Sequence, residues 1–332
     1  MLNWSREADA AINAVLSKQP IILVDVGASG APPRSWQKLA PLAYYVGFDP
    51  DLRELREDNA FGFQRFIMLN KAVSSADESE IRFFLTASPF CSSCLPPNPD
   101  VVDRYSFTDL FRVERTASVA ATTLSRALNE FGLEYIDCLK LDSQGKDLDI
   151  YLSLDADRRA RLLVLGIEPG VLDFYVGENT FAAAHARLVK DGYWLSRAAI
   201  QDSPRISKAT RTKLVGERLD FDSLPASPTA IDAQYFRTLE CLLARKAPVR
   251  DQVCIWVLAM VNDNLGFALD VAASLADSGA EGKLGEMLIQ ETIAEIRRRA
   301  TASGPFWSTA KALVPRVLHP LARRLMTALR RR

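Results

Sequence analysis

The chain has 332 residues, of which 48% are hydrophobic and 25% are charged, and its formal net charge is zero. This composition is typical of a globular protein, and the neutral charge argues against nucleic acid as a partner. The N-terminal residues mix charges and lack a continuous apolar stretch, so no secretory signal is predicted. Five cysteines, an odd number, favour a reducing cytoplasmic location over a disulfide framework.

The first part of the chain reads as a helix followed by short strands. Apolar residues at helical spacing predict a helix over 4–18. Short apolar runs, typical of strands covered on both faces, lie at 21–26, 43–48 and 63–69. Further elements are predicted as a short helix within 34–41, a polar surface helix over 51–59 and an extra strand over 80–85. Residues 86–107 are rich in proline and predict a long loop, of the kind that forms lids or substrate walls.

Helices and strands alternate in the next part of the chain. Helices are predicted over 122–131, near 146–160 and over 178–190, and strands over 135–141, over 162–167 and from 193. This alternation predicts a doubly wound, mostly parallel Rossmann-like α/β sheet. Beyond residue 220 the predicted elements are all helical, over 232–244, 251–276, 282–300 and 309–331. We therefore expect an α/β domain over 1–220 and a helical extension over 221–332.

A glycine turn follows the first predicted strand directly. Asp25 leads into Gly27-Ala-Ser-Gly30, and Asp49 ends the next apolar run about 20 residues later. This spacing is typical of the nucleotide-binding half of a doubly wound sheet. The glycines read G-x-x-G, and no Gly-Lys-Ser/Thr follows, so neither a dinucleotide pyrophosphate nor a triphosphate has its usual cradle. An acid before the turn suits a ligand with a positive charge, such as the amino group of S-adenosylmethionine.

These positions predict the binding of that cofactor in detail. The turn residues Gly27, Ala28, Ser29 and Gly30 would lie under its methionine part. Asp25 would face the amino group, directly or through water, and Asp49 would bind the ribose hydroxyls. Ala72 and Val73, just past the third strand, would lie near the adenine.

Acids also end the later strands, where Asp142 and Glu168 follow the fourth and fifth apolar runs. Buried carboxylates are costly unless they are paired or face a site, so their convergence indicates function. A hydroxyl acceptor needs a base, and we expect Asp142 or Glu168 to supply it, with His185 as a third candidate whose alternative is a structural role on its helix. Cys91-Ser-Ser-Cys94 has no second ligand pair, so no metal site is predicted.

Longer motifs in the same order resemble the FkbM family of S-adenosylmethionine-dependent methyltransferases over about residues 20–200. The motifs are Leu23-Val-Asp-Val-Gly-Ala-Ser-Gly30, Val46-Gly-Phe-Asp-Pro-Asp51, Cys91-Ser-Ser-Cys-Leu-Pro-Pro-Asn98, Thr123-Leu-Ser-Arg-Ala-Leu128, Ile136-Asp-Cys-Leu-Lys-Leu-Asp-Ser-Gln-Gly145 and Gly166-Ile-Glu-Pro169. The resemblance implies O-methylation of a hydroxyl, with Asp25, Gly27 and Asp49 at the cofactor and Asp142 at the methyl-transfer end. Lys146-Asp147 replaces the Ala-Glu that the family usually carries, and Lys146 either adjusts the pKa of an acid or faces solvent.

We therefore expect a methyltransferase that acts on a hydroxyl of a saccharide, glycolipid or related metabolite. The alternative is a non-catalytic S-adenosylmethionine-binding or interaction module of a glycan-assembly complex. A nicotinamide-dependent oxidoreductase is a third reading, and the missing third glycine weighs against it. The basic amphipathic segment 309–332 suits an anionic membrane surface at the inner face, or docking on its own domain. Whether the chain forms a homo-oligomer stays open.

Overall fold

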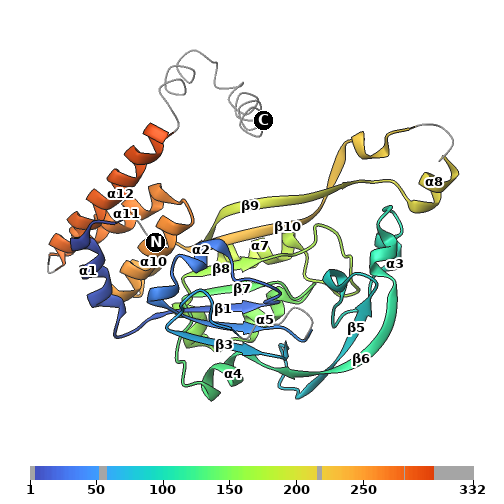
Figure 1. Ribbon diagram of the computed structural model, residues 1–332, viewed down its shortest axis with the longest axis horizontal. Helices are drawn as coiled ribbons and strands as arrows, with labels where there is room; N and C mark the ends of the chain where they lie inside the picture. Colours follow the sequence, from blue (N-terminus) through green and yellow to red (C-terminus); the bar gives the residue numbers. More distant parts are fainter. Residues whose placement is uncertain (1–3, 52–57, 215–218, 280, 303–332) are drawn as a thin grey trace, which may run out of the picture.

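A seven-stranded sheet forms the centre of the computed structural model, which describes residues 4–51, 58–214, 219–279 and 281–302. Its strands are β1 (Ile21–Val26), β2 (Ala43–Phe48), β3 (Arg65–Leu69), β7 (Cys138–Leu141), β8 (Val164–Ile167), β9 (Tyr193–Pro204) and β10 (Ala226–Arg237). The order across the sheet is β3-β2-β1-β7-β8-β10-β9. The first five strands in that order are parallel, and β10 runs antiparallel to both β8 and β9. The chain therefore reverses its direction of travel across the sheet between β1 and β7 (Figure 1).

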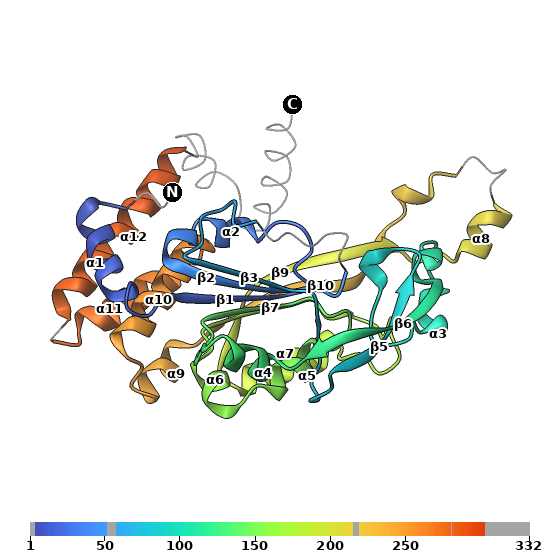
Figure 2. The same cartoon turned by 60° about the horizontal axis from the view of Figure 1, so that its bottom comes forward.

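Helices cover both faces of this sheet, as a doubly wound fold requires (Figure 2). Successive side chains of β1 alternate between two hydrophobic cores, with Leu23 in one and Val24 in the other. One face carries α1 (Arg6–Leu16), α2 (Arg34–Gln37), η1 (Ala40–Leu42) and α10 (Val249–Val261). The other face carries α4 (Leu124–Glu130), α5 (Asp147–Ser153), α6 (Ala156–Arg161) and α7 (Phe181–Lys190). Burial on both faces explains why these strands are continuously apolar, and the predicted fold class is confirmed.

A smaller sheet stands beside the carboxyl ends of the parallel strands. It contains β4 (Ala72–Val73), β5 (Glu80–Thr86) and β6 (Val113–Thr122) in the order β4-β6-β5. Most side chains of β6 are exposed, so its sequence has no apolar pattern and the strand was not predicted. The predicted loop between β5 and β6 contains three short helices, η2 (Pro89–Cys91), α3 (Pro99–Val102) and η3 (Thr108–Phe111).

The strands β9 and β10 form a long ribbon whose far end extends beyond the sheet (Figure 1). The short helices α8 (Lys208–Lys213) and η5 (Phe221–Ser223) lie between the two strands in the sequence. The prediction of a helix over 232–244 is wrong for its first half, because residues up to Arg237 belong to β10. The second half is confirmed as α9 (Leu239–Ala244). The domain boundary at 220 stays a prediction, but residues 226–237, which lie beyond it, belong to the sheet.

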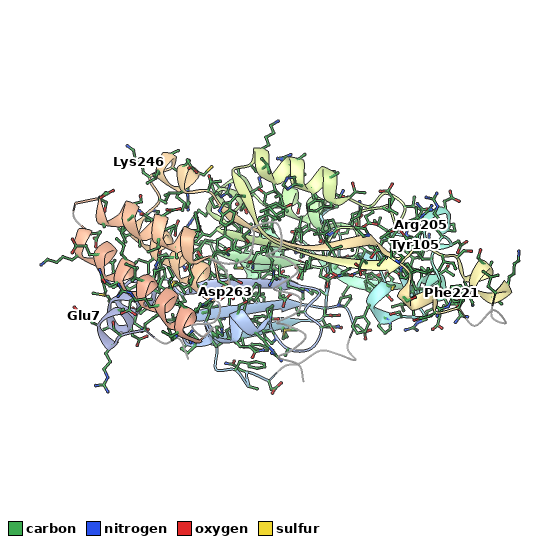
Figure 3. The ribbon with its side chains drawn as sticks, turned by 90° about the horizontal axis from the view of Figure 1, so that it is seen from above. Glu7, Tyr105, Arg205, Phe221, Lys246 and Asp263 are labelled. Atoms are coloured by element: carbon green, nitrogen blue, oxygen red, sulfur yellow. The ribbon has the colours of Figure 1, made fainter. Side chains whose placement is uncertain are left out.

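The helical extension lies at the opposite end of the molecule from the ribbon tip (Figures 1 and 3). The single helix expected over 251–276 is two helices, α10 and α11 (Leu265–Ala276), since Asp263 adopts a left-handed conformation with φ 65°. The region expected as one helix near 146–160 is likewise divided into α5 and α6. The extension ends with α12 (Gly282–Ala302). Within the described residues, no helix is both long and apolar enough to cross a membrane.

Two predicted elements fall largely outside the described residues. These are the basic helix over 309–331 and most of the surface helix over 51–59.

Candidate functional site

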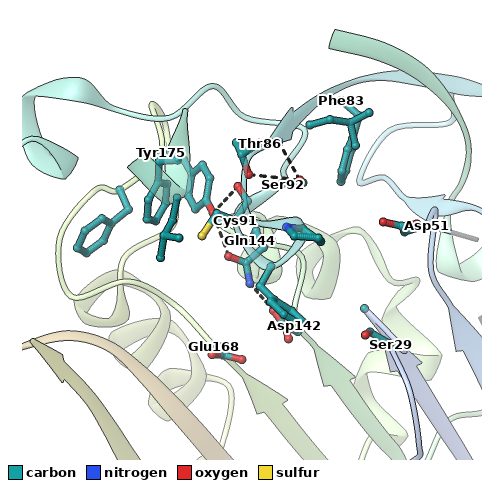
Figure 4. Close-up of a pocket in the computed structure, with 18 of the residues that line it drawn as sticks. Ser29, Asp51, Phe83, Thr86, Cys91, Ser92, Asp142, Gln144, Glu168 and Tyr175 are labelled. Carbon is teal, nitrogen blue, oxygen red and sulfur yellow. Dashed lines mark hydrogen bonds between the residues drawn. The ribbon is translucent and has the colours of Figure 1, made fainter. Parts of the chain in front are cut away.

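A cavity of about 1080 Å³ lies where β1, β2, β7 and β8 end (Figure 4). In a doubly wound sheet this edge, at the point where the strand order reverses, is the usual place for a ligand. The floor is formed by residues at the strand ends, namely Gly27, Ser29, Asp49, Asp142 and Glu168. The small sheet and the loop before β6 form one wall, and residues of the β9–β10 ribbon form another.

The glycine turn brings the ends of β1 and β7 together. Gly27 has φ +78°, and a Cβ built on it would lie 2.4 Å from the carbonyl oxygen of Asp142, so only glycine fits there. The N–H groups of Gly27 and Ala28 both donate to the carbonyl of Phe48, at 2.9 and 3.0 Å. Within the described part of the chain, the N–H groups of Ser29 and Gly30 have no acceptor. Of these two residues only Ser29 lines the cavity, so its N–H group is available there to an anionic group of a ligand.

Asp49 lies at the end of β2 and lines the cavity. Its side chain is mostly buried, with 7% of the residue exposed, and burial raises the pKa of its carboxyl group. One carboxylate oxygen accepts from the N–H of Asp51 at 2.7 Å, which fixes the orientation of the side chain.

Asp25 lies beneath the cavity floor and is not part of the lining. Its carboxylate accepts from the hydroxyl of Tyr45 at 3.0 Å and from Lys140 Nζ at 3.1 Å. Burial raises the pKa of Asp25, while the charge of Lys140 opposes that shift. The two residues are opposite each other in the β1–β7 register, so their side chains share one face. In this position Asp25 helps to order the floor, and its expected contact with an amino group, directly or through water, stays a prediction.

The other residues predicted for the site are not all brought to the cavity. Ala28 is buried beside it, and Gly30 lies in open space with φ +76°; neither is part of the lining. Ala72 and Val73 are buried in β4, where they pair with β6. His185 bonds to the hydroxyl of Tyr235 at 3.0 Å and stacks on Phe181, away from the cavity. The position of His185 therefore does not support a function as the catalytic base.

Asp142 is held by a chain of hydrogen bonds that ends in the wall of the cavity. Gln144 Nε2 donates to Asp142 Oδ1 at 2.7 Å, and the hydroxyl of Tyr175 donates to Gln144 Oε1 at 3.0 Å (Figure 4). Gln144 has φ 55°, an unusual conformation for a residue with a side chain, and Ser93 Oγ donates to its carbonyl at 2.7 Å. Strained residues of this kind are often found at functional sites.

Two lining acids, Glu168 and Glu178, have a pKa raised to about 7, but the carboxylate of Glu178 already accepts from the N–H groups of Gly170 and Tyr175, at 2.8 and 3.1 Å. Burial, together with the nearby charge of Asp142, raises the pKa of Glu168 to about 7. Gln201 Nε2, on β9, donates to the Glu168 carboxylate. The backbone of Glu168 is fixed by Asp147, which accepts from the N–H of Glu168 at 2.8 Å and from the N–H of Ser143 at 2.9 Å. A carboxyl group that titrates near neutral pH can both accept and return a proton.

Sequence reasoning did not identify the residues that support this site. Gln144 and Lys140 belong to the motif at 136–145, but the motif predicted no function for either side chain. Asp147 differs from the residue usual in the FkbM family, and this difference predicted no function. Gln201 had no signal in the sequence, since it lies on an exposed part of β9. Lys146, for which two roles were open, pairs with Asp149 at 2.7 Å and is not part of the lining.

Acids dominate the charge of the cavity lining. Seven carboxylates and one guanidinium line it: Asp49, Asp51, Glu114, Asp142, Glu168, Glu178, Asp202 and Arg115. Such a cavity favours cationic or neutral ligands and disfavours ligands that carry several phosphates. Among the described residues, no group of three or more His, Cys, Asp or Glu side chains could hold a metal ion.

Comparisons with known proteins assign no family to this chain. No protein-family model matches it, and no curated protein matches its sequence. Among solved structures, it is similar to magnesium protoporphyrin IX methyltransferase from Synechocystis PCC 6803, which was crystallised with bound S-adenosylmethionine. The identity is 11%, the TM-score is 0.28, and the match covers 70% of this chain and 79% of the other.

Proposed function

We propose that this chain is an S-adenosylmethionine-dependent O-methyltransferase that acts on a hydroxyl group. The observation that carries the proposal is the acid-lined cavity at the reversal of strand order, with Gly27 and Asp49 on one side and Glu168 on the other. When bound, S-adenosylmethionine supplies a methyl group that is already activated by a positive sulfonium.

The residues present fit this cofactor. The N–H group of Ser29, a lining residue, suits its carboxylate, and the oriented carboxylate of Asp49 suits the two hydroxyls of its ribose. The carboxylates of the lining would stabilise the positive charges of its amino and sulfonium groups. A dinucleotide or nucleoside triphosphate would instead place its phosphates among these carboxylates, which weighs against the oxidoreductase reading.

The protein's own contribution is to position the acceptor and to remove its proton. Bringing two reactants into line accounts for a large part of the rate of such displacements. In our proposal Glu168 accepts the hydroxyl proton, because its pKa near 7 leaves a useful fraction ionised at neutral pH. Asp142, fixed by Gln144, would orient the acceptor hydroxyl beside it.

Calorimetry tests cofactor binding and a transfer assay tests catalysis. We expect S-adenosylmethionine and S-adenosylhomocysteine to bind and NAD not to bind; binding of NAD alone would contradict the proposal. Asp142→Asn should keep cofactor binding and abolish transfer of labelled methyl groups to cell-envelope or metabolite fractions. Asp149→Asn, which changes an acid outside the lining, is the matched control. Cofactor binding without transfer to any fraction would favour the non-catalytic module.

The finer parts of the proposal rest on the motifs that resemble the FkbM family. They support a saccharide or glycolipid as the acceptor. A cytoplasmic location agrees with the five cysteines, all of which are free in the structure. We also propose that residues 309–332 bring the protein to an anionic membrane surface. A homo-oligomer remains open to measurement by light scattering.

A further inference from the structure

The loop between β5 and β6 presents large apolar side chains at the cavity. Phe90 is 73% exposed and Leu110 is 47% exposed, and both line the cavity. Exposed apolar side chains that gather at a cavity commonly mark a binding surface. We call Phe90, Phe107, Leu110 and Phe111 the apolar wall.

Ring packing holds Phe107 and Phe111 of the apolar wall in place. Phe107 and Phe111 have ring centroids 6.0 Å apart, and Phe111 lies 5.8 Å from Phe174 in a stacked arrangement. Behind them, Tyr105 is fully buried in a small core of its own. This part of the wall is therefore preformed, so a ligand gains contact with it at little cost in ordering the protein.

The floor of the same cavity is polar, as Asp142 and Glu168 lie at its strand ends (Figure 4). A ligand that spans the cavity therefore needs a hydroxylated part at the floor and an apolar part at the wall. A phosphate or carboxylate group on this ligand would be repelled by the seven acids of the lining and attracted only by Arg115. Such unfavourable charge is a means of excluding the wrong ligand.

We propose that the acceptor is an uncharged hydroxylated head group joined to an apolar chain or ring, and that the apolar wall binds the apolar part. That this ligand accepts a methyl group rests on the proposed function, whereas the binding of an uncharged amphiphile at the apolar wall does not. The surface thus selects acceptors by their apolar part and excludes phosphorylated ones.

Binding of alkyl glucosides tests the proposal. Glucose, hexyl glucoside and octyl glucoside, all below their micelle concentrations, are titrated into the full chain by calorimetry, with and without S-adenosylhomocysteine. We expect affinity to rise about twofold to fourfold for each added methylene. Octyl phosphate, with the same chain and an anionic head, should bind at least about tenfold more weakly than octyl glucoside.

Variants locate the binding surface. Phe90→Ser and Leu110→Ser are expected to reduce the affinity for octyl glucoside about tenfold and to flatten its dependence on chain length. Leu243→Ser is the matched control, since Leu243 is 52% exposed and lies outside this cavity. This variant should leave the affinity for octyl glucoside and its dependence on chain length unchanged. Affinity independent of chain length, equal binding of octyl phosphate, or an equal loss in Leu243→Ser would overturn the proposal.

The same preparations separate this inference from the proposed function. If S-adenosylhomocysteine binds and chain length has no effect, the inference about the apolar wall fails while the proposed function stands. If octyl glucoside binds as expected and no adenosyl ligand binds, the proposed function fails and the wall remains a binding surface for amphiphiles.

Discussion

Asp25 and Asp49 lie near the ends of neighbouring strands, yet they have different surroundings. Asp25 is one residue before the end of β1, so its side chain lies below the floor, where Lys140 and Tyr45 satisfy it. Asp49 follows the last residue of β2 and lines the cavity. Asp25 is level with Gly47 in the register, so a difference of two positions along the strands separates the acid that supports the site from the acid that lines it.

Glu168→Gln tests the proposed base. The variant is expected to lower the transfer rate about 100- to 10,000-fold while S-adenosylmethionine still binds. In the wild type, the rate should rise with pH through about 7, since the ionised form of Glu168 is the base. Rates measured between pH 5.5 and 8.5 check this, with Glu240→Gln as an exposed control. A pH profile that is identical in Glu168→Gln would exclude Glu168 as the base.

The same substitution has a consequence for stability. Because the pKa of Glu168 is raised in the folded chain, the favourable contribution of its neutral form is present below about pH 4.5 and is lost as pH rises through about 7. Glu168→Gln should therefore gain melting temperature relative to the wild type at pH 8 and not at pH 4. Thermal unfolding at both pH values measures the difference, and a larger gain at pH 4 would contradict the expectation.

Tyr175→Phe tests the positioning of Asp142. The substitution removes the hydroxyl that donates to Gln144 and keeps the ring that packs on Phe111. The hydroxyl is shared between Gln144 Oε1 and the carbonyl of Cys91, each at 3.0 Å, and its loss should reduce kcat about twofold to tenfold, with cofactor affinity unchanged. If kcat is unchanged and only stability falls, Tyr175 has a purely structural role.

At the scale of elements, the helical extension is joined to the sheet by a buried ion pair. Arg250 on α10 donates to both carboxylate oxygens of Asp137, just before β7, with Nη2 at 2.7 Å from one of them. Asp137 also accepts from the N–H of Ile22 on β1 at 2.9 Å. The helical extension is therefore bonded to the central sheet through Asp137, and we expect the two parts to stabilise each other.

Arg250→Ala should destabilise the whole protein. It leaves the buried carboxylate of Asp137 without its charged partner, which is expected to cost about 3 to 5 kcal/mol of unfolding free energy. Arg126→Ala removes an exposed ion pair with Asp77 and should cost at most about 1 kcal/mol. Urea denaturation of both variants measures the contrast. Similar losses in the two would show that the buried pair does not hold the extension to the sheet.

At the scale of the whole molecule, the neutral total charge conceals a strong asymmetry. Residues 309–332 contain seven of the 41 basic residues and none of the 41 acidic ones, so the remainder has 34 basic and 41 acidic residues. Removal of residues 309–332 should therefore abolish binding to vesicles with anionic lipid. Sedimentation with vesicles at low and high salt measures this, because each Lys or Arg near the surface contributes about 1 kcal/mol that salt screens. Equal binding of the shortened chain would refute the membrane proposal.

The sequence predicted the parts of the fold that local pattern dictates. The strands β1, β2, β7 and β8 are short, mostly apolar runs that alternate with helices, and this alternation indicated a parallel sheet. The ribbon formed by β9 and β10 was missed for the most part, because many of its residues are exposed and its pairing joins segments distant in sequence. Backbone pairing of this kind leaves little trace in side-chain type.

For the site, the sequence by itself determined the glycine turn and the acids that follow the parallel strands, because each is a local consequence of how a strand ends. Only the tertiary structure decided which acids face the cavity, since that depends on strand register and on partners such as Lys140 and Tyr45. It also decided that Gln144, Gln201 and the apolar wall meet at one place. These contacts join residues far apart in the chain, and a sequence records them only through the packing that brings them together.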